Sequence, residues 1–211
     1  MTTTTPSLAL TYFGLPGRAE LTRLLLAYGN VPFTDTRMTY PEFVSQKSSL
    51  TLPFGQLPTL QVNNSTTYGQ SMAMARYAAK LVGLYPSDPL LALEADAIVD
   101  AIVECYDATF PLLFGDLDDD VRHAKFTQLN TAVFPRALAN LEKVVKGPFF
   151  TGPTATFADL YLLDLMDNLL GGFPDKIQVE TTKYTKLHAI ATQLRTCDQL
   201  KAYFEAKGQR P

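Results

Sequence analysis

The chain of 211 residues has no tryptophan, two cysteines and two histidines. Cys105 and Cys197 lie far apart, without the short spacing that is typical of metal ligands, so we expect no metal site. So few cysteines also argue against a disulfide framework and are typical of reduced thiols inside a cell. A secreted mini-domain and a zinc module are therefore not expected.

Long apolar runs and an excess of positive charge are also missing. No run approaches the roughly 20 apolar residues of a membrane span, and residues 1–7 lack the basic and apolar regions of an export signal. The net charge is −3 and the isoelectric point is about 5.4, which indicates no polycationic surface for nucleic acid or anionic lipid. We expect a cytoplasmic protein without membrane or nucleic-acid partners.

The remaining composition, with 46% hydrophobic and 18% charged residues, suffices for an ordinary core. Residues 8–13 alternate apolar and polar side chains as a short strand does, and glycines and a proline follow. Apolar residues then recur at helical spacing over residues 21–28, and residues 33–38 read as a second strand. The chain therefore starts as a β-α-β unit with a right-handed crossover.

The strand signal ends at a segment rich in glycine and proline around residues 83–89. Helical periodicity continues beyond it, with a kink expected at Pro135 and a capping box at Thr156-Phe157-Ala158-Asp159. The sequence predicts an α/β domain over residues 1–83, a linker over 84–89 and an all-α domain over 90–211.

The stretch between Leu52 and Ser71 combines three features that suit ligand binding. Leu57-Pro58 precedes a strand, and a cis bond there would turn the backbone of Leu57 outward to pair with a peptide-like ligand. A hairpin with the turn pair Asn63-Asn64 follows. Gln70-Ser71 then opens a helix, whose free N–H groups form a site for a carboxylate or phosphate.

In this order and spacing, the motifs resemble those of the cytosolic glutathione transferases, of the tyrosine type and most of all of the sigma class. The resemblance covers nearly the whole chain. It implies a thioredoxin-like first domain, a homodimer, and glutathione as co-substrate with no permanently bound cofactor. It rests on Leu10-Thr11-Tyr12-Phe13, Gly17-Arg18-Ala19-Glu20, Thr51-Leu52-Pro53-Phe54-Gly55-Gln56-Leu57-Pro58, Gln70-Ser71 and Thr156-Phe157-Ala158-Asp159.

The resemblance gives catalytic roles to Tyr12 and Arg18. The Tyr12 phenol would donate a hydrogen bond to the glutathione thiolate, which is needed because the neutral thiol is a poor nucleophile. Arg18 would place a permanent positive charge nearby. From spacing alone, Tyr12 reads as a core tyrosine and Arg18 as the partner of an acid such as Glu20.

Glutathione itself carries two carboxylates, an amine and two amides, and the resemblance implies a partner for each. Leu57 and Pro58 would bind the cysteinyl amides, and Gln70 and Ser71 the γ-glutamyl carboxylate. A sigma-class tryptophan is absent, so Phe43 takes its place in ungapped register. The glycyl carboxylate would then be held by Lys47 and Gln56, and Glu104 would reach the γ-glutamyl amine across a dimer interface.

Aromatic residues are expected to wall the pocket for the electrophile, although such residues on helices are as often plain core. Phe54, in a loop between two prolines, resembles an aromatic key that inserts between helices of the partner subunit. The expected pocket residues are Phe13, Leu15, Tyr106, Phe110 and Tyr161.

The sequence thus predicts a glutathione transferase that conjugates the thiolate to small hydrophobic electrophiles. Two alternatives stay open. One is a glutathione-dependent isomerase or peroxidase. The other is a non-catalytic structural or ligand-carrying relative like the lens crystallins of this lineage, against which the intact Tyr12 and Arg18 argue.

Overall fold

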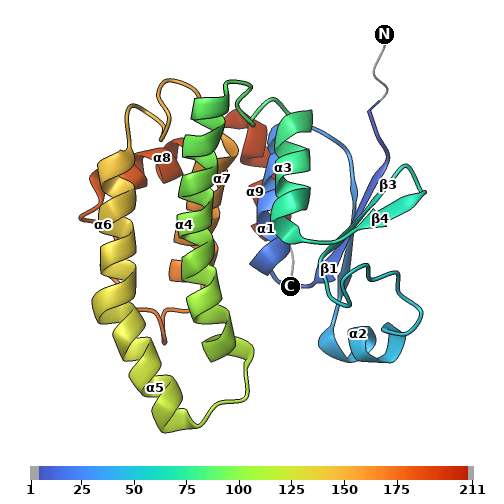
Figure 1. Cartoon of the computed structure of the whole chain (residues 1–211), viewed down its shortest axis with the longest axis horizontal. Coiled ribbons are helices and arrows are strands. Elements are labelled where there is room, and N and C mark those ends of the chain that lie inside the picture. Colours follow the sequence, from blue (N-terminus) through green and yellow to red (C-terminus); the bar gives the residue numbers. More distant parts are fainter. Residues whose placement is uncertain (1–4, 209–211) are drawn as a thin grey trace. The chain divides into compact units, whose positions relative to one another are not determined.

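The computed structural model describes residues 5–208, and contacts within it define two compact units (Figure 1). The sheet unit comprises residues 5–84 and 198–208, and the helical unit comprises residues 85–197. The domain boundaries expected from the sequence stay a prediction. The contact-based units differ from them at the C-terminal end, because the last helix packs on a helix of the sheet unit. Residues 1–4, part of the segment searched for an export signal, lie outside the described residues.

The sheet of residues 5–208 has four strands in the order β2-β1-β3-β4. β1 pairs in parallel with β2, while β3 pairs antiparallel with both β1 and β4, as the predicted β-α-β start and hairpin require. Asn63 and Asn64 of the hairpin turn have φ of 54° and 51°, the left-handed conformation that asparagine tolerates. The strands are β1 (Leu8–Phe13), β2 (Thr34–Met38), β3 (Thr59–Val62) and β4 (Thr66–Tyr68).

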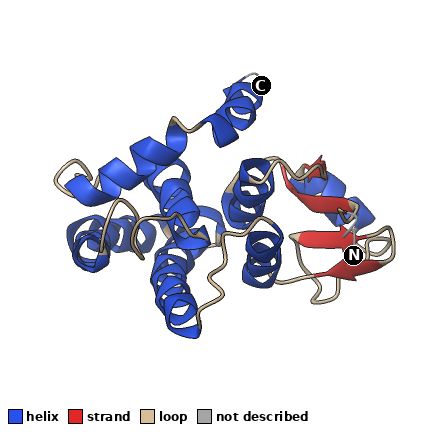
Figure 2. Ribbon diagram, turned by 90° about the horizontal axis from the view of Figure 1, so that it is seen from above, coloured by secondary structure: helices blue, strands red, loops and turns tan. Residues whose placement is uncertain are grey.

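Helices cover both faces of this sheet, with α1 and α3 together on one face and α2 on the other (Figure 2). The apolar face of α1 is buried, as its periodicity predicts. The last helix, α9, contacts α1. The bounds are η1 (Gly17–Ala19), α1 (Glu20–Tyr28), α2 (Tyr40–Gln46), α3 (Ser71–Leu81) and α9 (Asp198–Gly208).

The helical unit confirms the all-α character expected for the second half of the chain. The disturbance expected at Pro135 takes the form of a π-helical turn just before α6, whose second residue is that proline. Among the helices of residues 5–208, none combines the length and apolar character needed to cross a membrane. The elements are α4 (Pro89–Phe114), α5 (Asp119–Gln128), η2 (Leu129–Val133), α6 (Phe134–Val144), α7 (Phe157–Asp164), η3 (Leu165–Leu170) and α8 (Thr185–Arg195).

The predicted capping box opens α7. Asp159 is buried and accepts hydrogen bonds from the backbone N–H of Thr156 at 2.7 Å, from the Thr156 hydroxyl at 3.0 Å and from the Phe150 N–H at 2.9 Å. Burial raises the pKa of the Asp159 carboxyl, and these donors act in the opposite direction. The carboxyl thereby joins the start of α7 to the preceding loop inside the core.

Candidate active site

A cavity of about 370 Å³ in the sheet unit brings together residues from three separate motifs. It lies where the end of β1, the loop before β3 and the start of α3 meet. Seven of the residues singled out in the sequence line it: Tyr12, Arg18, Gln56, Leu57, Pro58, Gln70 and Ser71.

Tyr12 is the second-last residue of β1, and its side chain is almost fully buried. Its hydroxyl oxygen accepts a hydrogen bond from the backbone N–H of Arg18, with a nitrogen–oxygen distance of 3.3 Å. Gly17 has φ of +48°, and a Cβ at this position would lie 2.8 Å from the Tyr12 hydroxyl oxygen. Glycine is therefore required here, both for the backbone conformation and for space beside the phenol.

Leu57 and Pro58 bring the backbone before β3 to the same cavity. The bond between them is cis, and both side chains are buried, whereas the neighbouring Gln56 is exposed. A buried pair followed by the interior strand β3 holds the backbone fixed at this end of the strand.

The start of α3 forms the third wall. Ser71 is its first residue, so the unpaired N–H groups and the positive end of the helix dipole are directed there. Gln70 before it has φ of 71° and ψ of 103°, a conformation that non-glycine residues rarely adopt. Strained backbone of this kind is concentrated at ligand sites, where surrounding structure stabilises it.

Phe43 and Lys47 do not line this cavity, although both were expected to contact glutathione. The Phe43 ring packs edge-on against Phe13, with centroids 5.4 Å apart, and the Lys47 ammonium lies 5.7 Å from the Phe43 ring centroid. Tyr40, which the sequence reasoning missed, also neighbours Phe13, at 6.4 Å. The sequence could have indicated this neighbour, because Tyr40 begins the same short helix α2 that carries Phe43. The roles of Phe43 and Lys47 stay predictions.

The remaining aromatic residues expected around the electrophile fall into two groups. In the helical unit, Tyr106 stacks on Tyr161 with centroids 5.3 Å apart and meets the edge of Phe110 at 5.4 Å. Phe13 and Leu15 belong to the sheet unit and are partly exposed. A common pocket walled by all five stays a prediction.

Phe54, the expected dimer key, is 62% exposed. Its ring lies over Gly69, where any Cβ would come within 2.8 Å of it.

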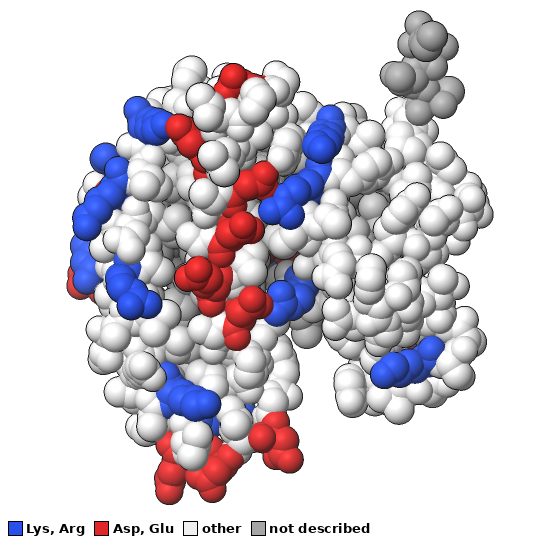
Figure 3. Space-filling model, viewed as in Figure 1, with Lys and Arg blue, Asp and Glu red and all other residues white. Residues whose placement is uncertain are grey.

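In the helical unit, a second cavity of about 370 Å³ lies between α4 and α6, with Ala101, Ala137 and Leu141 among its lining residues. Glu104 lies at its edge and is exposed. Figure 3 shows acidic side chains following α4, where Glu104 is found.

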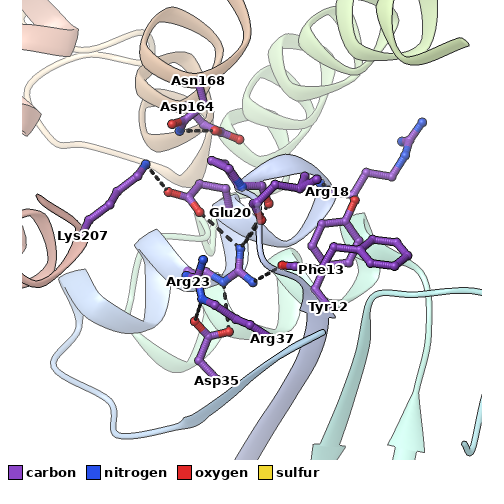
Figure 4. A network of polar contacts seen from close by, with 12 residues as sticks. Tyr12, Phe13, Arg18, Glu20, Arg23, Asp35, Arg37, Asp164, Asn168 and Lys207 are labelled. Atoms are coloured by element: carbon purple, nitrogen blue, oxygen red, sulfur yellow. Dashed lines mark hydrogen bonds and ion pairs between the residues drawn. The ribbon is translucent and has the colours of Figure 1, made fainter. Parts of the chain in front are cut away.

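Sequence reasoning also missed Arg23, which is fully buried in α1 and hydrogen-bonds the turn that follows Tyr12 (Figure 4). The sequence signal was a single charged residue inside the mainly apolar run of residues 21–27. A cation buried there needs several acceptors, so contacts to nearby carbonyls or carboxylates could have been expected.

Within residues 5–208, no group of three or more histidine, cysteine or acidic side chains could hold a metal ion.

Two protein-family profiles match the chain. They are described as "Glutathione S-transferase, N-terminal domain", over residues 8–80, and "Glutathione S-transferase, C-terminal domain", over residues 106–207. A glutathione S-transferase of Anopheles gambiae is 34% identical over 185 residues, which cover 82% of this chain and 89% of that protein. The hematopoietic prostaglandin D synthase of Gallus gallus is 32% identical over 205 residues, covering 96% and 97%.

Among solved structures, rat hPGDS complexed with a quinoline aligns with a TM-score of 0.83 and 27% sequence identity, over 97% of this chain and 98% of that chain. The likeness confirms the predicted fold class, a thioredoxin-like α/β part followed by helices. Because the matched profiles cover both halves of the chain and the relatives align along most of its length, the chain belongs to the glutathione S-transferase family.

Proposed function

We propose that this chain binds glutathione in the seven-residue cavity of the sheet unit and transfers the glutathionyl group to small hydrophobic electrophiles. The observation that carries the proposal is the meeting of Tyr12, Leu57 and Ser71 around one cavity. A phenol, the backbone just before β3 and a helix N-terminus are the partners that a thiol, an amide and a carboxylate of one tripeptide require.

In this arrangement, the γ-glutamyl carboxylate binds at the start of α3, with the Ser71 hydroxyl and N–H as donors and Gln70 beside them. The cysteinyl amides pair with the backbone of Leu57. Gln56, which lines the cavity and is exposed, donates its amide N–H to the glycyl carboxylate. The cysteine sulfur then lies toward Tyr12.

Tyr12 acts on the thiol by donating its O–H to the thiolate. Because its oxygen accepts the N–H of Arg18, the O–H is polarised and becomes a stronger donor. Each unit by which the thiol pKa falls corresponds to about 1.4 kcal/mol of preference for the thiolate. In the reaction, the sulfur forms a bond to the electrophilic carbon, and the leaving group departs with the electron pair of the broken bond.

The aromatic residues supply the apolar surroundings that a hydrophobic electrophile needs. We assign Phe13 and Leu15 of the sheet unit and the Tyr106, Phe110 and Tyr161 cluster to this role. The Tyr106 and Tyr161 rings stack on each other and are buried, so Phe110, which meets the edge of Tyr106 and is partly exposed, is the member of the cluster that an apolar ligand would contact.

A homodimer is part of the proposal. The exposed Phe54 ring of one subunit enters the cavity between α4 and α6 of its partner, where alanine and leucine side chains leave room for it. The exposed ring and the apolar part of the cavity lining each gain free energy from burial. Glu104 at the edge of that cavity then lies at the subunit interface.

We also propose a cytoplasmic location, because free cysteines and the use of glutathione are typical of that reducing compartment.

Turnover of a chloronitrobenzene tests the main proposal. The expected product is the glutathione thioether, with one glutathione consumed and one chloride released per turnover. A chain that binds glutathione and turns over neither this substrate nor an isomerisable peroxide would instead be the non-catalytic relative considered from the sequence.

A second candidate is the glutathione-dependent isomerase. The similarity to proteins named prostaglandin D synthase favours it. Isomerisation regenerates glutathione, whereas conjugation consumes it, so measuring the glutathione used per product formed with an isomerisable peroxide separates the two. Peroxide reduction would oxidise glutathione to its disulfide and is recognised by that product.

A further inference from the structure

A buried arginine lies behind the turn that carries Tyr12 into the cavity. The Nη1 atom of Arg23 donates to the carbonyl oxygens of Leu15 at 3.0 Å and Pro16 at 3.2 Å, and Nη2 reaches that of Phe13 at 3.5 Å. We call residues 13–16 the active-site turn. These carbonyls precede the N–H of Arg18 by only a few residues, and this N–H contacts the Tyr12 hydroxyl.

Two carboxylates contact the guanidinium of Arg23, and each of them also contacts a second cation. Its Nε donates to Asp35 of β2 at 3.1 Å, and Arg37 contacts the other oxygen of Asp35 at 2.8 Å. Its Nη1 also contacts Glu20 at 3.4 Å. Figure 4 shows Glu20 and Asp35 on either side of the guanidinium. Removing one member of such a buried group leaves an uncompensated charge.

The C-terminal helix α9 supplies the remaining partners of Glu20. The Tyr203 hydroxyl donates to Glu20 Oε1 at 2.9 Å, and the Lys207 ammonium donates to the same oxygen at 2.8 Å. Burial, followed by the nearby Glu20 carboxylate, raises the pKa of Tyr203, so its hydroxyl stays a donor. Glu20 is therefore shared, with Oε2 toward Arg23 and Oε1 toward α9.

This sharing matters because the Nη1 atom has fewer hydrogens than acceptors. A guanidinium Nη carries two N–H groups, and three oxygens surround this one, those of Leu15, Pro16 and Glu20. If α9 did not satisfy Glu20, its buried carboxylate would draw Nη1 away from the turn carbonyls. The turn would then hold the N–H of Arg18 less firmly against the Tyr12 hydroxyl.

We infer that Arg23 is a positioning residue for Tyr12, and that Tyr203 and Lys207 of α9 keep it directed at the active-site turn through Glu20. The inference rests on the proposed function, because its consequence is the ionisation of bound glutathione. It gives the C-terminal helix a role in thiol activation, although neither Tyr203 nor Lys207 lines the cavity.

The test is the double variant Tyr203→Phe with Lys207→Met, compared with wild type in full-length protein. The pKa of bound glutathione, followed by thiolate absorbance, is expected to rise by about half a unit. Below that pKa, the thiolate fraction and hence kcat/KM for the chloronitrobenzene should fall about threefold, while the glutathione dissociation constant changes less than about twofold. Lys207→Arg, which keeps the charge and the donor, should behave as wild type.

Matched controls separate positioning from stability. Lys201→Met removes an exposed lysine of the same helix, and Tyr184→Phe removes a tyrosine hydroxyl that donates to the Pro135 carbonyl at 3.0 Å. Tyr184→Phe should lower the unfolding free energy without moving the thiol pKa. If the double variant does not fold, Lys207→Met alone carries the same expectation, because its side chain is 31% exposed and removable.

The outcomes are distinct. A lower unfolding free energy with an unchanged thiol pKa would show a structural role only and would overturn the inference. If wild-type protein neither lowers the thiol pKa nor turns over the substrate, the proposed function fails first, and the inference fails with it.

Discussion

The hydroxyl oxygen of Tyr12 lies 3.3 Å from the backbone nitrogen of Arg18 and accepts its N–H. The two residues are joined by the short turn after β1, and Gly17 leaves space beside the phenol. The polar end of Tyr12 is therefore fixed at the cavity, while its ring stays in the core.

Tyr12→Phe should remove the donor to the thiolate and leave glutathione bound. A hydrogen bond to a charged group contributes about 1.5–3 kcal/mol, so the pKa of the bound thiol should rise by about 1–2 units. Thiolate absorbance measured against pH, together with calorimetric binding, checks both halves. The matched control is Tyr68→Phe, at an exposed tyrosine of the same sheet. A large loss of affinity with an unchanged thiol pKa would contradict the assigned role.

The sequence predicted those parts of the fold that depend on contacts between residues close together in the chain. The capping box between Thr156 and Asp159 and the left-handed turn at Asn63 and Asn64 are local patterns with few alternatives. The cavity residues were found through motifs, since spacing alone favours a core role for Tyr12.

The rest depends on partners that are distant in the chain. Glu20 meets Tyr203 and Lys207 some 180 positions later, which no local pattern encodes. Helical periodicity predicts this helix but not the element that it packs on, so α9 was expected in the domain over residues 90–211 and packs on α1 instead. The Lys47 ammonium likewise lies over the Phe43 ring, a contact that no sequence pattern predicted.

Phe54→Ala should weaken the proposed homodimer. A desolvated aromatic anchor commonly contributes about 2 kcal/mol or more, which corresponds to a dissociation constant raised roughly 30-fold. Sedimentation velocity over a dilution series measures this change. Tyr40→Ala is the control, because Tyr40 is an equally exposed aromatic residue of the sheet unit.

The receiving cavity can be tested from its own side. Ala101→Phe should fill the space between α4 and α6 and weaken the dimer as Phe54→Ala does, since Ala101 lines that cavity. If only Ala101→Phe weakens association, Phe54 is not the inserted group. If neither changes sedimentation, the proposed interface is wrong.

The two cysteines should differ sharply in reactivity. Burial, and then the neighbouring Glu104 charge, raises the pKa of Cys105 to about 11. Only about one thiol in a thousand is then ionised at pH 8, and labelling of the native protein should accelerate about tenfold per pH unit up to that pKa. Cys197 is partly exposed and should react first.

Ellman's reagent with the variant Cys197→Ser checks this difference. Native Cys197→Ser protein should release almost no chromophore at pH 8, and one equivalent after denaturation. Fast labelling of the native variant would mean that Cys105, at the α4–α6 cavity, is reached by solvent and ionised more readily than its burial implies.

The glycyl carboxylate of glutathione has two candidate partners, and their variants should respond differently to salt. Gln56 lines the cavity, whereas Lys47 is exposed at the end of α2. An exposed ion pair contributes about 0–1 kcal/mol and is screened by salt, so Lys47→Ala should raise the glutathione dissociation constant about fivefold or less, and only at low ionic strength. Gln56→Ala should weaken binding by a similar or larger factor at every ionic strength, because its neutral amide bond is not screened. Neither change should move the thiol pKa, since the glycyl end is remote from the sulfur.

Calorimetry at two salt concentrations measures both effects, with Lys80→Ala, an exposed lysine of α3, as the charge control. A salt-dependent loss larger than tenfold for Lys47→Ala would show that Lys47 leaves the Phe43 ring and becomes the principal partner of this carboxylate.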